Sequence, residues 1–332
     1  MPAIAAAAET HGGPSSANAP REASPHARLT ARASLLLLAS LAATVLAPLW
    51  LLLLAPIVLG VPHVVADLRW LVLRPGVERR VLVAIAPPLA AMTALRVINL
   101  AGGGSWPAVE IALGGAAIAG AIAFSVERAS TQRAAIALAA AALLIAAGLL
   151  APRQIALWLG HAHNLVAFGL LLAWWPAPSR NRAAVALVFA ACAALIALGA
   201  LDPLSRAAGG FAAPSTGLDF AGLTATLAPG LAPTLALRLV LLFAFAQAVH
   251  YAVWLSLLPR AVAPRAPLLS SLRAELGTPG LLVAAALALA VPACGLFAPA
   301  RTRALYLSLV LFHGWLELAL IARLAVRGKA RS

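Results

Sequence analysis

Long apolar runs follow one another along the chain from about residue 34 to about residue 324. Each run is apolar at consecutive positions and does not alternate with polar residues, so it predicts a membrane-spanning helix and not a strand of a membrane barrel. The first run, 34–73, is twice the length of about 20 residues that a helix needs to cross the hydrocarbon. We divide it near Pro48, because proline ends or kinks a helix. The other runs are 81–100, 107–124, 134–150, 155–175, 183–201, 233–258, 279–298 and 303–324.

These runs predict an all-α fold, a polytopic integral membrane helical bundle of about ten transmembrane helices surrounded by the lipid bilayer. The composition agrees with this prediction. Of the 332 residues 63% are hydrophobic and 10% are charged, whereas a soluble domain has about 45–50% and 25%. The mean hydropathy is +0.97. The fold classes of soluble proteins are therefore excluded.

The charged residues indicate how the chain crosses the membrane. The 24 basic and 10 acidic residues give a net charge of +14, and nearly all arginines lie between the apolar runs. No segment interleaves them with the polar and aromatic contacts of a nucleic-acid-binding face, so we expect no nucleic-acid partner. With a cytoplasmic N-terminus, the inside segments contain sixteen basic residues, which are Arg21, Arg28, Arg32, Arg74, Arg79, Arg80, Arg128, Arg133, Arg180, Arg182, Arg260, Arg265, Arg273, Arg327, Lys329 and Arg331. The outside segments contain four, which are Arg153, Arg206, Arg301 and Arg303.

Short cytoplasmic loops carry the excess of arginine and lysine in membrane proteins. We therefore expect a multi-pass protein with both termini in the cytoplasm, and the preference for arginine over lysine indicates the inner membrane of a bacterium. Residues 1–32 are predicted to be a flexible cytoplasmic tail, 33–325 the transmembrane helical domain and 326–332 a basic cytoplasmic tail. Within the domain, 202–232 is the longest outside segment, and we expect it to cap the outer face.

Four of the predicted spans carry polar side chains, which are costly in hydrocarbon, at about 2.5–3.5 kcal/mol for a central aspartate. These side chains are His63 and Asp67, His161 and His163, Gln247 and His250, and His313 and Glu317. In the first and last of these spans the histidine and the carboxylate are four residues apart, so each pair shares one helix face. His161 and His163 differ by roughly 200° of rotation, so only one of them is expected to face a shared site, and we favour His161.

These residues lie at similar depths in the bilayer, so side chains from different helices can meet. Counting along each helix, His63 and His313 lie near the midplane, and the other histidines lie within roughly 8 Å of it. We therefore predict a metal site whose candidate ligands are His63, His161, His163, His250 and His313. Asp67 and Glu317 are the candidate catalytic carboxylates, which would orient imidazoles or complete the shell of ligands. Imidazoles and carboxylates around an open position are typical of non-haem iron, so Fe²⁺ is the expected cofactor.

The stretch GVPHVVAD, residues 60–67, resembles the G-x-P-H-x-x-x-D signature of the bacterial Brp/Blh family. Members of that family are polytopic helical membrane β-carotene dioxygenases that cleave the polyene centrally to retinal, with iron held by histidines from several spans. The resemblance implies that His63 is an iron ligand. It also implies that His250, and either His161 or His163, correspond to later histidines of the family. The family has glycine after the histidine of the motif, where this chain has Val64.

Our first hypothesis is an integral-membrane, histidine-ligated metalloenzyme, a non-haem iron oxygenase that acts on a lipophilic, carotenoid-like small molecule. One alternative is a haem-binding membrane protein, in which two of the histidines ligate the iron axially. The other is a non-catalytic transporter that uses the histidines and carboxylates as a proton or metal-ion relay. These alternatives leave open whether the protein is an enzyme, and no protein partner is indicated by the sequence.

Overall fold

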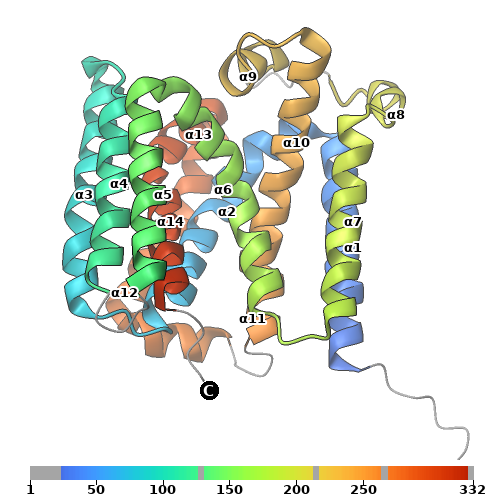
Figure 1. Cartoon of the computed structure of the whole chain (residues 1–332). Coiled ribbons are helices and arrows are strands. Elements are labelled where there is room, and N and C mark those ends of the chain that lie inside the picture. Colours follow the sequence, from blue (N-terminus) through green and yellow to red (C-terminus); the bar gives the residue numbers. More distant parts are fainter. Residues whose placement is uncertain (1–23, 126–130, 212–216, 263–267, 328–332) are drawn as a thin grey trace, which may run out of the picture.

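The computed structural model describes residues 24–125, 131–211, 217–262 and 268–327, and these form helices joined by turns and short connections, with no strand (Figure 1). The helices are α1 (Pro25–Leu46), α2 (Pro48–Asp67), α3 (Arg79–Ile98), α4 (Pro107–Ala123), α5 (Thr131–Leu150), α6 (Pro152–Trp174), α7 (Ser179–Ala197), α8 (Asp202–Ala207), α9 (Phe220–Leu227), α10 (Pro233–Ala252), α11 (Leu258–Val262), α12 (Leu268–Phe297), α13 (Pro299–Leu309) and α14 (Leu311–Arg327). Three π-helical segments extend them, which are η1 (Leu68–Leu73), η2 (Asn99–Gly103) and η4 (Val253–Leu257).

The prediction of an all-α membrane bundle is confirmed, and each of the ten predicted spans has a helical counterpart. Within the described residues, nine helical stretches are long and apolar enough to cross a membrane, and α4 is a shorter apolar helix. Four of these spans are composite: α2 continues into η1, α3 into η2, α10 through η4 into α11, and α13 into α14. The division near Pro48 is also confirmed, because α1 ends at Leu46 and Pro48 is the first residue of α2. Proline suits this position because it lacks the N–H that the first helical turn leaves unpaired.

α1 begins and α14 ends at the same end of the bundle, the lower one in Figure 1. The short helices α8 and α9 lie at the opposite end, which we call the α8–α9 end (Figure 1). Both belong to the segment 202–232, which was expected to cap one face, and α9 packs against α10. The segment is therefore partly helical, which its many glycines and prolines had not indicated.

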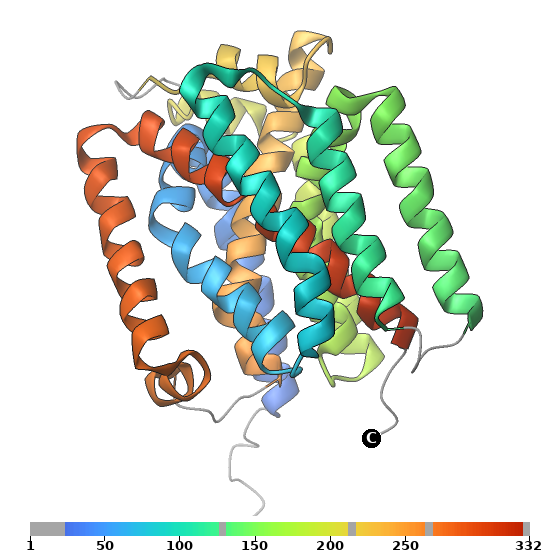
Figure 2. The same cartoon turned by 90° about the vertical axis from the view of Figure 1, so that its left-hand side faces the viewer.

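α14 runs diagonally through the bundle behind α3 and α4 (Figure 2). It packs against α3, α4 and α5, and also contacts α2 and α6. The close approach to α4 depends on Gly114, because a Cβ atom there would lie 2.1 Å from the ring of Trp315. Small residues allow membrane helices to pack closely in this way. α12 differs from the other spans, since it lies at the edge of the bundle in Figure 2 and no residue of its apolar window is buried.

An ion-pair cluster fastens the start of α3 to the end of α14. Arg323 donates to Oε2 of Glu78 at 2.7 Å, and Arg327 donates to Oε1 at 2.5 Å. The hydrogen bond from Arg323, together with that from Arg327, lowers the pKa of Glu78 from 4.5 to about 2. Since Arg323 is 3% exposed, the carboxylate of Glu78 also neutralises a buried guanidinium.

This cluster predicts a stability that depends on pH. Because the pKa of Glu78 in the folded protein lies below its ordinary value of 4.5, the stabilisation is complete above that pH and is lost as the pH falls toward 2. We expect Glu78→Gln to lower the stability at neutral pH by about 1 kcal/mol, because solvent screens this partly exposed pair. Thermal unfolding in detergent, measured for both proteins over a pH series, should show their difference shrinking in acid. A difference that does not change with pH would contradict this assignment.

Candidate metal centre

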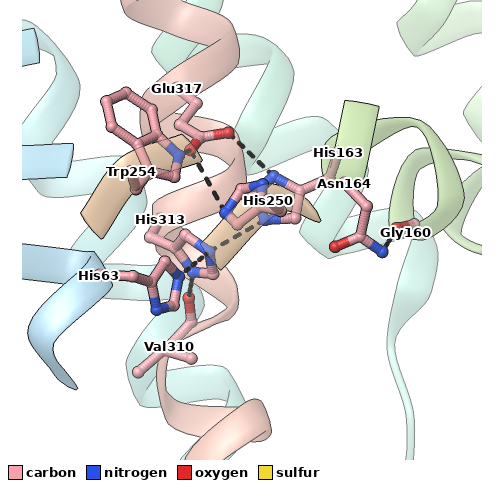
Figure 3. A network of polar contacts seen from close by, with 9 residues as sticks. All are labelled: His63, Gly160, His163, Asn164, His250, Trp254, Val310, His313 and Glu317. Carbon is pink, nitrogen blue, oxygen red and sulfur yellow. Dashed lines mark hydrogen bonds and ion pairs between the residues drawn. The ribbon is translucent and has the colours of Figure 1, made fainter. Parts of the chain in front are cut away.

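Four histidines from four helices meet in the interior of the bundle (Figure 3). They are His63 on α2, His163 on α6, His250 on α10 and His313 on α14. The Nε2 atom of His313 lies 3.2 Å from Nε2 of His63 and 3.0 Å from Nε2 of His163. The ring of His250 completes the group, with its centroid 4.6 Å from that of His163 and 5.4 Å from that of His63. We call these four residues the histidine cluster.

The break between α13 and α14 fixes the orientation of His313. Val310 leaves the helical conformation, with φ −91° and ψ 6°, and its carbonyl accepts a hydrogen bond from Nδ1 of His313. The Nδ1 atom therefore carries the proton, and Nε2 presents a lone pair to the histidine cluster. The sequence analysis treated 303–324 as one uninterrupted helix, so this acceptor was not predicted.

Glu317 lies beside His163. Its Oε2 atom is 3.0 Å from Nδ1 of His163, an ion-pair distance without hydrogen-bond geometry, and Nε2 of that ring lies 3.0 Å from Nε2 of His313. Its Oε1 atom accepts a hydrogen bond from the indole of Trp254 at 3.1 Å and lies 4.0 Å from Nε2 of His250. The Glu317 side chain is 0% exposed. A carboxylate that fixes the tautomer and angle of an imidazole is the usual support of a metal ligand.

Trp254 is a residue of the site that the sequence analysis did not identify. It belongs to η4 and is fully buried. It lies four residues after His250, so the two side chains are on the same side of the span. This spacing was the only feature of the sequence that could have indicated that Trp254 belongs to the site. Its indole N–H finds its partner in Glu317, as buried tryptophans generally require a partner for this group.

The preference for His161 over His163 is wrong. The Nε2 atom of His161 lies 2.9 Å from the carbonyl oxygen of Leu227, so this ring bonds to α9 and lies outside the histidine cluster. The helix face that His161 shares with Trp158 and Leu165 is turned away from the bundle, because these two side chains are 62% and 48% exposed. His163 is adjacent to the buried Asn164, which marks the inward face of α6.

Asp67 is buried with its carboxylate unpaired. It is 0% exposed, and neither of its oxygens has a hydrogen-bond partner among the described residues. It therefore does not orient His63 directly, although the two residues are one turn apart on α2. Asp67 is thus a carboxyl group in the interior of the bundle without a hydrogen bond to an imidazole.

A cavity of about 250 Å³ adjoins the histidine cluster, and the four imidazoles form part of its wall. Its apolar lining consists mainly of side chains from α6, α10, α13 and α14, which include Leu159, Phe243, Leu307, Leu311, Trp315 and Leu318. Tyr251 and Tyr306 also line it, and the ring of Tyr251 packs edge-on against His63 with centroids 4.7 Å apart. The arrangement is an apolar chamber with nitrogen ligands on one wall.

The distances within the histidine cluster suit one transition-metal ion. An imidazole nitrogen lies about 2.1 Å from a bound metal, so two ligands at a right angle lie about 3.0 Å apart. The observed Nε2 separations are 3.0 and 3.2 Å. Ligand atoms of His63, His250 and His313 also lie within 4.8 Å of one another, as do those of His163, His250 and Glu317.

Comparisons with known proteins add no relative: no family model, curated protein or solved structure matches the chain. The resemblance to the Brp/Blh family rests on residues 60–67 and remains an expectation from the sequence.

The contact between Glu317 and His163 leads to a second prediction. Glu317→Gln keeps the size of the side chain but removes the charge that fixes the imidazole, so we expect the affinity for Fe²⁺ to fall about 10–100-fold. Anaerobic competition with a chromophoric chelator would measure this affinity in the purified protein. Glu78→Gln makes the same chemical change away from the cavity and serves as the control. Equal affinities for the two variants would argue against the role given to Glu317.

Proposed function

We propose that this protein is an integral-membrane metalloenzyme that holds non-haem iron at the histidine cluster and oxygenates a lipophilic substrate. One observation carries the proposal. Nδ1 of His313 donates to the carbonyl of Val310, so its Nε2 is a lone pair, and the Nε2 atoms of His163 and His63 both converge on it, at 3.0 and 3.2 Å. One lone pair can accept only one of these two contacts as a hydrogen bond, whereas a cation between the rings would bind all three nitrogens.

The two buried carboxyl groups near the histidine cluster support the binding of a divalent ion. Asp67 and Glu317 are both 0% exposed, and among the described residues no arginine or lysine lies within ion-pair distance of either. An uncompensated buried carboxylate is costly, so such groups are paired or lie near a metal. If a divalent cation binds among the imidazoles, both carboxyl groups can ionise, and their combined charge of about −2 would balance it.

Iron is the metal that the donor set favours. Imidazole nitrogen suits iron, copper, zinc and nickel, and a site of imidazoles with neighbouring carboxylates and open positions is typical of non-haem iron oxygenases. A bound iron ion would supply the binding and activation of O₂. The chain itself would hold the four nitrogens in place, through Val310 and Glu317, and would keep bulk water away from them.

The spacing of the imidazoles favours non-haem iron over haem. Two axial histidines of a haem have nitrogens about 4 Å apart, with a flat macrocycle between them. The Nε2 separations of 3.0 and 3.2 Å leave no space for such a ring. We therefore expect the purified protein to lack a Soret band.

The cavity supports a lipophilic substrate, because its walls are mostly apolar side chains of spans that lie within the bilayer. Together with the resemblance of residues 60–67 to the Brp/Blh family, this makes a carotenoid-like polyene the proposed substrate class. Cleavage of one double bond by one molecule of O₂ yields two carbonyl groups, so that the reaction balances without a further reductant. The apolar walls would align the polyene beside the imidazoles.

The metal content of the purified protein tests the central claim. We expect near-stoichiometric iron after anaerobic purification with iron supplied, and loss of most of it in His163→Ala and His313→Ala. His161→Ala is the matched control, because it removes an imidazole from the same helix outside the histidine cluster and should leave the iron content unchanged. His163→Gln, which keeps more of the side-chain volume, separates loss of the ligand from loss of packing.

Two results would reject this proposal. One is wild-type protein that contains no metal under these conditions. The other is iron that survives both ligand substitutions. Either outcome would favour a proton or metal-ion relay, which ion flux in proteoliposomes would then reveal.

A polyene assay tests the proposed reaction. We expect iron-loaded protein in detergent to convert β-carotene to aldehyde products with equimolar uptake of O₂, and His161→Ala to retain this activity. His313→Ala should abolish it, because its Nε2 is the central nitrogen of the histidine cluster. Chromatography of the products, together with an oxygen electrode, would measure both quantities. Iron-loaded wild-type protein that leaves the polyene intact would exclude this substrate while leaving the metal site in place.

A further inference from the structure

A buried ion pair lines the same cavity as the histidine cluster. Arg96 of α3 donates from Nη2 to Oε2 of Glu110 on α4 at 2.5 Å, and both residues belong to the cavity wall. The side chain of Glu110 is 5% exposed and that of Arg96 is 27% exposed. We call these two residues the Arg96–Glu110 pair. Nothing in the proposed reaction at the imidazoles requires them.

The Arg96–Glu110 pair lies on the side of the cavity toward the α8–α9 end of the bundle. α3 and α4 are joined at that end (Figure 1), and Glu110 is three residues from the start of α4 at Pro107. One helical turn further along α4, Gly114 touches the ring of Trp315, two residues beyond His313. Glu110 therefore lies about one turn of α4, about 6 Å, nearer that end than Gly114.

Polar atoms of several residues that line the cavity remain without partners. Nε of Arg96 and Oε1 of Glu110 are buried and have no hydrogen-bond partner among the described residues. The same is true of Oε1 of Gln247 and the hydroxyl of Tyr306, which also line the cavity. Buried polar groups are almost always hydrogen-bonded, so unpaired donors and acceptors that face one cavity indicate a ligand with polar atoms of its own.

The unpaired atoms define the chemistry of that ligand. The Arg96–Glu110 pair is neutral as a whole, so a carboxylate would be repelled by Glu110 and an ammonium group by Arg96. It offers one free N–H donor, on Arg96, and one free carboxylate acceptor, on Glu110. A hydroxyl group matches both, because its oxygen accepts one hydrogen bond and its O–H donates another.

We propose that the cavity takes a lipophile with a neutral hydroxyl group, which the Arg96–Glu110 pair binds while the apolar chain extends toward the histidine cluster. This inference rests on the proposed function in one respect, since it identifies that lipophile as the class of substrate for the metal centre. The pair then acts as a positioning element. It sets the distance between the hydroxyl group and the part of the chain that lies beside the imidazoles.

Two polyenes that differ only in their O–H group test the proposal. All-trans-retinol carries a free hydroxyl group, and retinyl methyl ether carries the same chain with that proton replaced. Fluorescence titration into purified, iron-loaded full-length protein in detergent gives the dissociation constant of each. We expect retinol to bind about tenfold more tightly than the ether, which corresponds to about 1.4 kcal/mol.

The double variant Arg96→Leu/Glu110→Leu removes both partners at once. Replacing a buried ion pair by apolar residues of similar size is often neutral for stability, whereas removing one partner leaves an unpaired charge. We expect the double variant to keep its iron and to bind both polyenes equally. Arg238→Leu/Asp202→Leu is the matched control, because that pair, with an N–O distance of 3.7 Å, lies outside the cavity wall.

The outcomes separate this inference from the proposed function. A preference for retinol that disappears only in the Arg96→Leu/Glu110→Leu variant supports the hydroxyl site, whatever the iron content. Wild-type protein that binds neither polyene, or that binds both equally, overturns it, as does a preference that survives in the double variant. If the protein contains no iron but still binds retinol more tightly than the ether, the proposed oxygenase is rejected and the hydroxyl site is supported.

Discussion

The burial of four imidazoles and two carboxylates inside an apolar bundle is the constraint on which the rest of this structure depends. Each polar group removed from water needs a partner, and in the hydrocarbon only other spans can provide one. Glu317 meets this need for Trp254, whose indole donates to it, and its carboxylate also lies 3.0 Å from His163 and 4.0 Å from His250. Several nitrogens of the histidine cluster still have no hydrogen-bond partner among the described residues, and a metal ion is a group that would supply one.

Irregular backbone lies next to three of the four histidines. α2 passes into η1 five residues after His63, α10 passes into η4 three residues after His250, and the chain breaks at Val310 three residues before His313. Departures from the α-helix free a carbonyl or shift the direction of a side chain, and π-helical turns are frequent at functional sites. Here one of them supplies the acceptor for His313, and another carries Trp254 to Glu317. The site is built from these interruptions as much as from the helices.

The fold was largely predictable from the sequence because apolar runs and proline positions decide where a chain crosses a bilayer. The histidines and carboxylates were predictable for the same reason, since polar residues stand out in such runs. The choice between His161 and His163 was not, because it depends on the rotation of α6 about its axis, which packing against α10 and α4 determines. Trp254 lies four residues after His250, but an indole in a membrane helix is typical of the membrane interface. Val310 was missed because a valine in an apolar run carries no distinctive signal.

The order of the ligands along the chain has a consequence for biogenesis. His313 and Glu317 lie on α14, whereas His63 lies on α2, 250 residues earlier in the chain. The imidazoles on α2, α6 and α10 are therefore synthesised before the partners that α14 provides. A chain that stops short of residue 313 would hold three of the four imidazoles without His313 and Glu317, so a metal ion that needs the complete histidine cluster could bind only after α14 is synthesised.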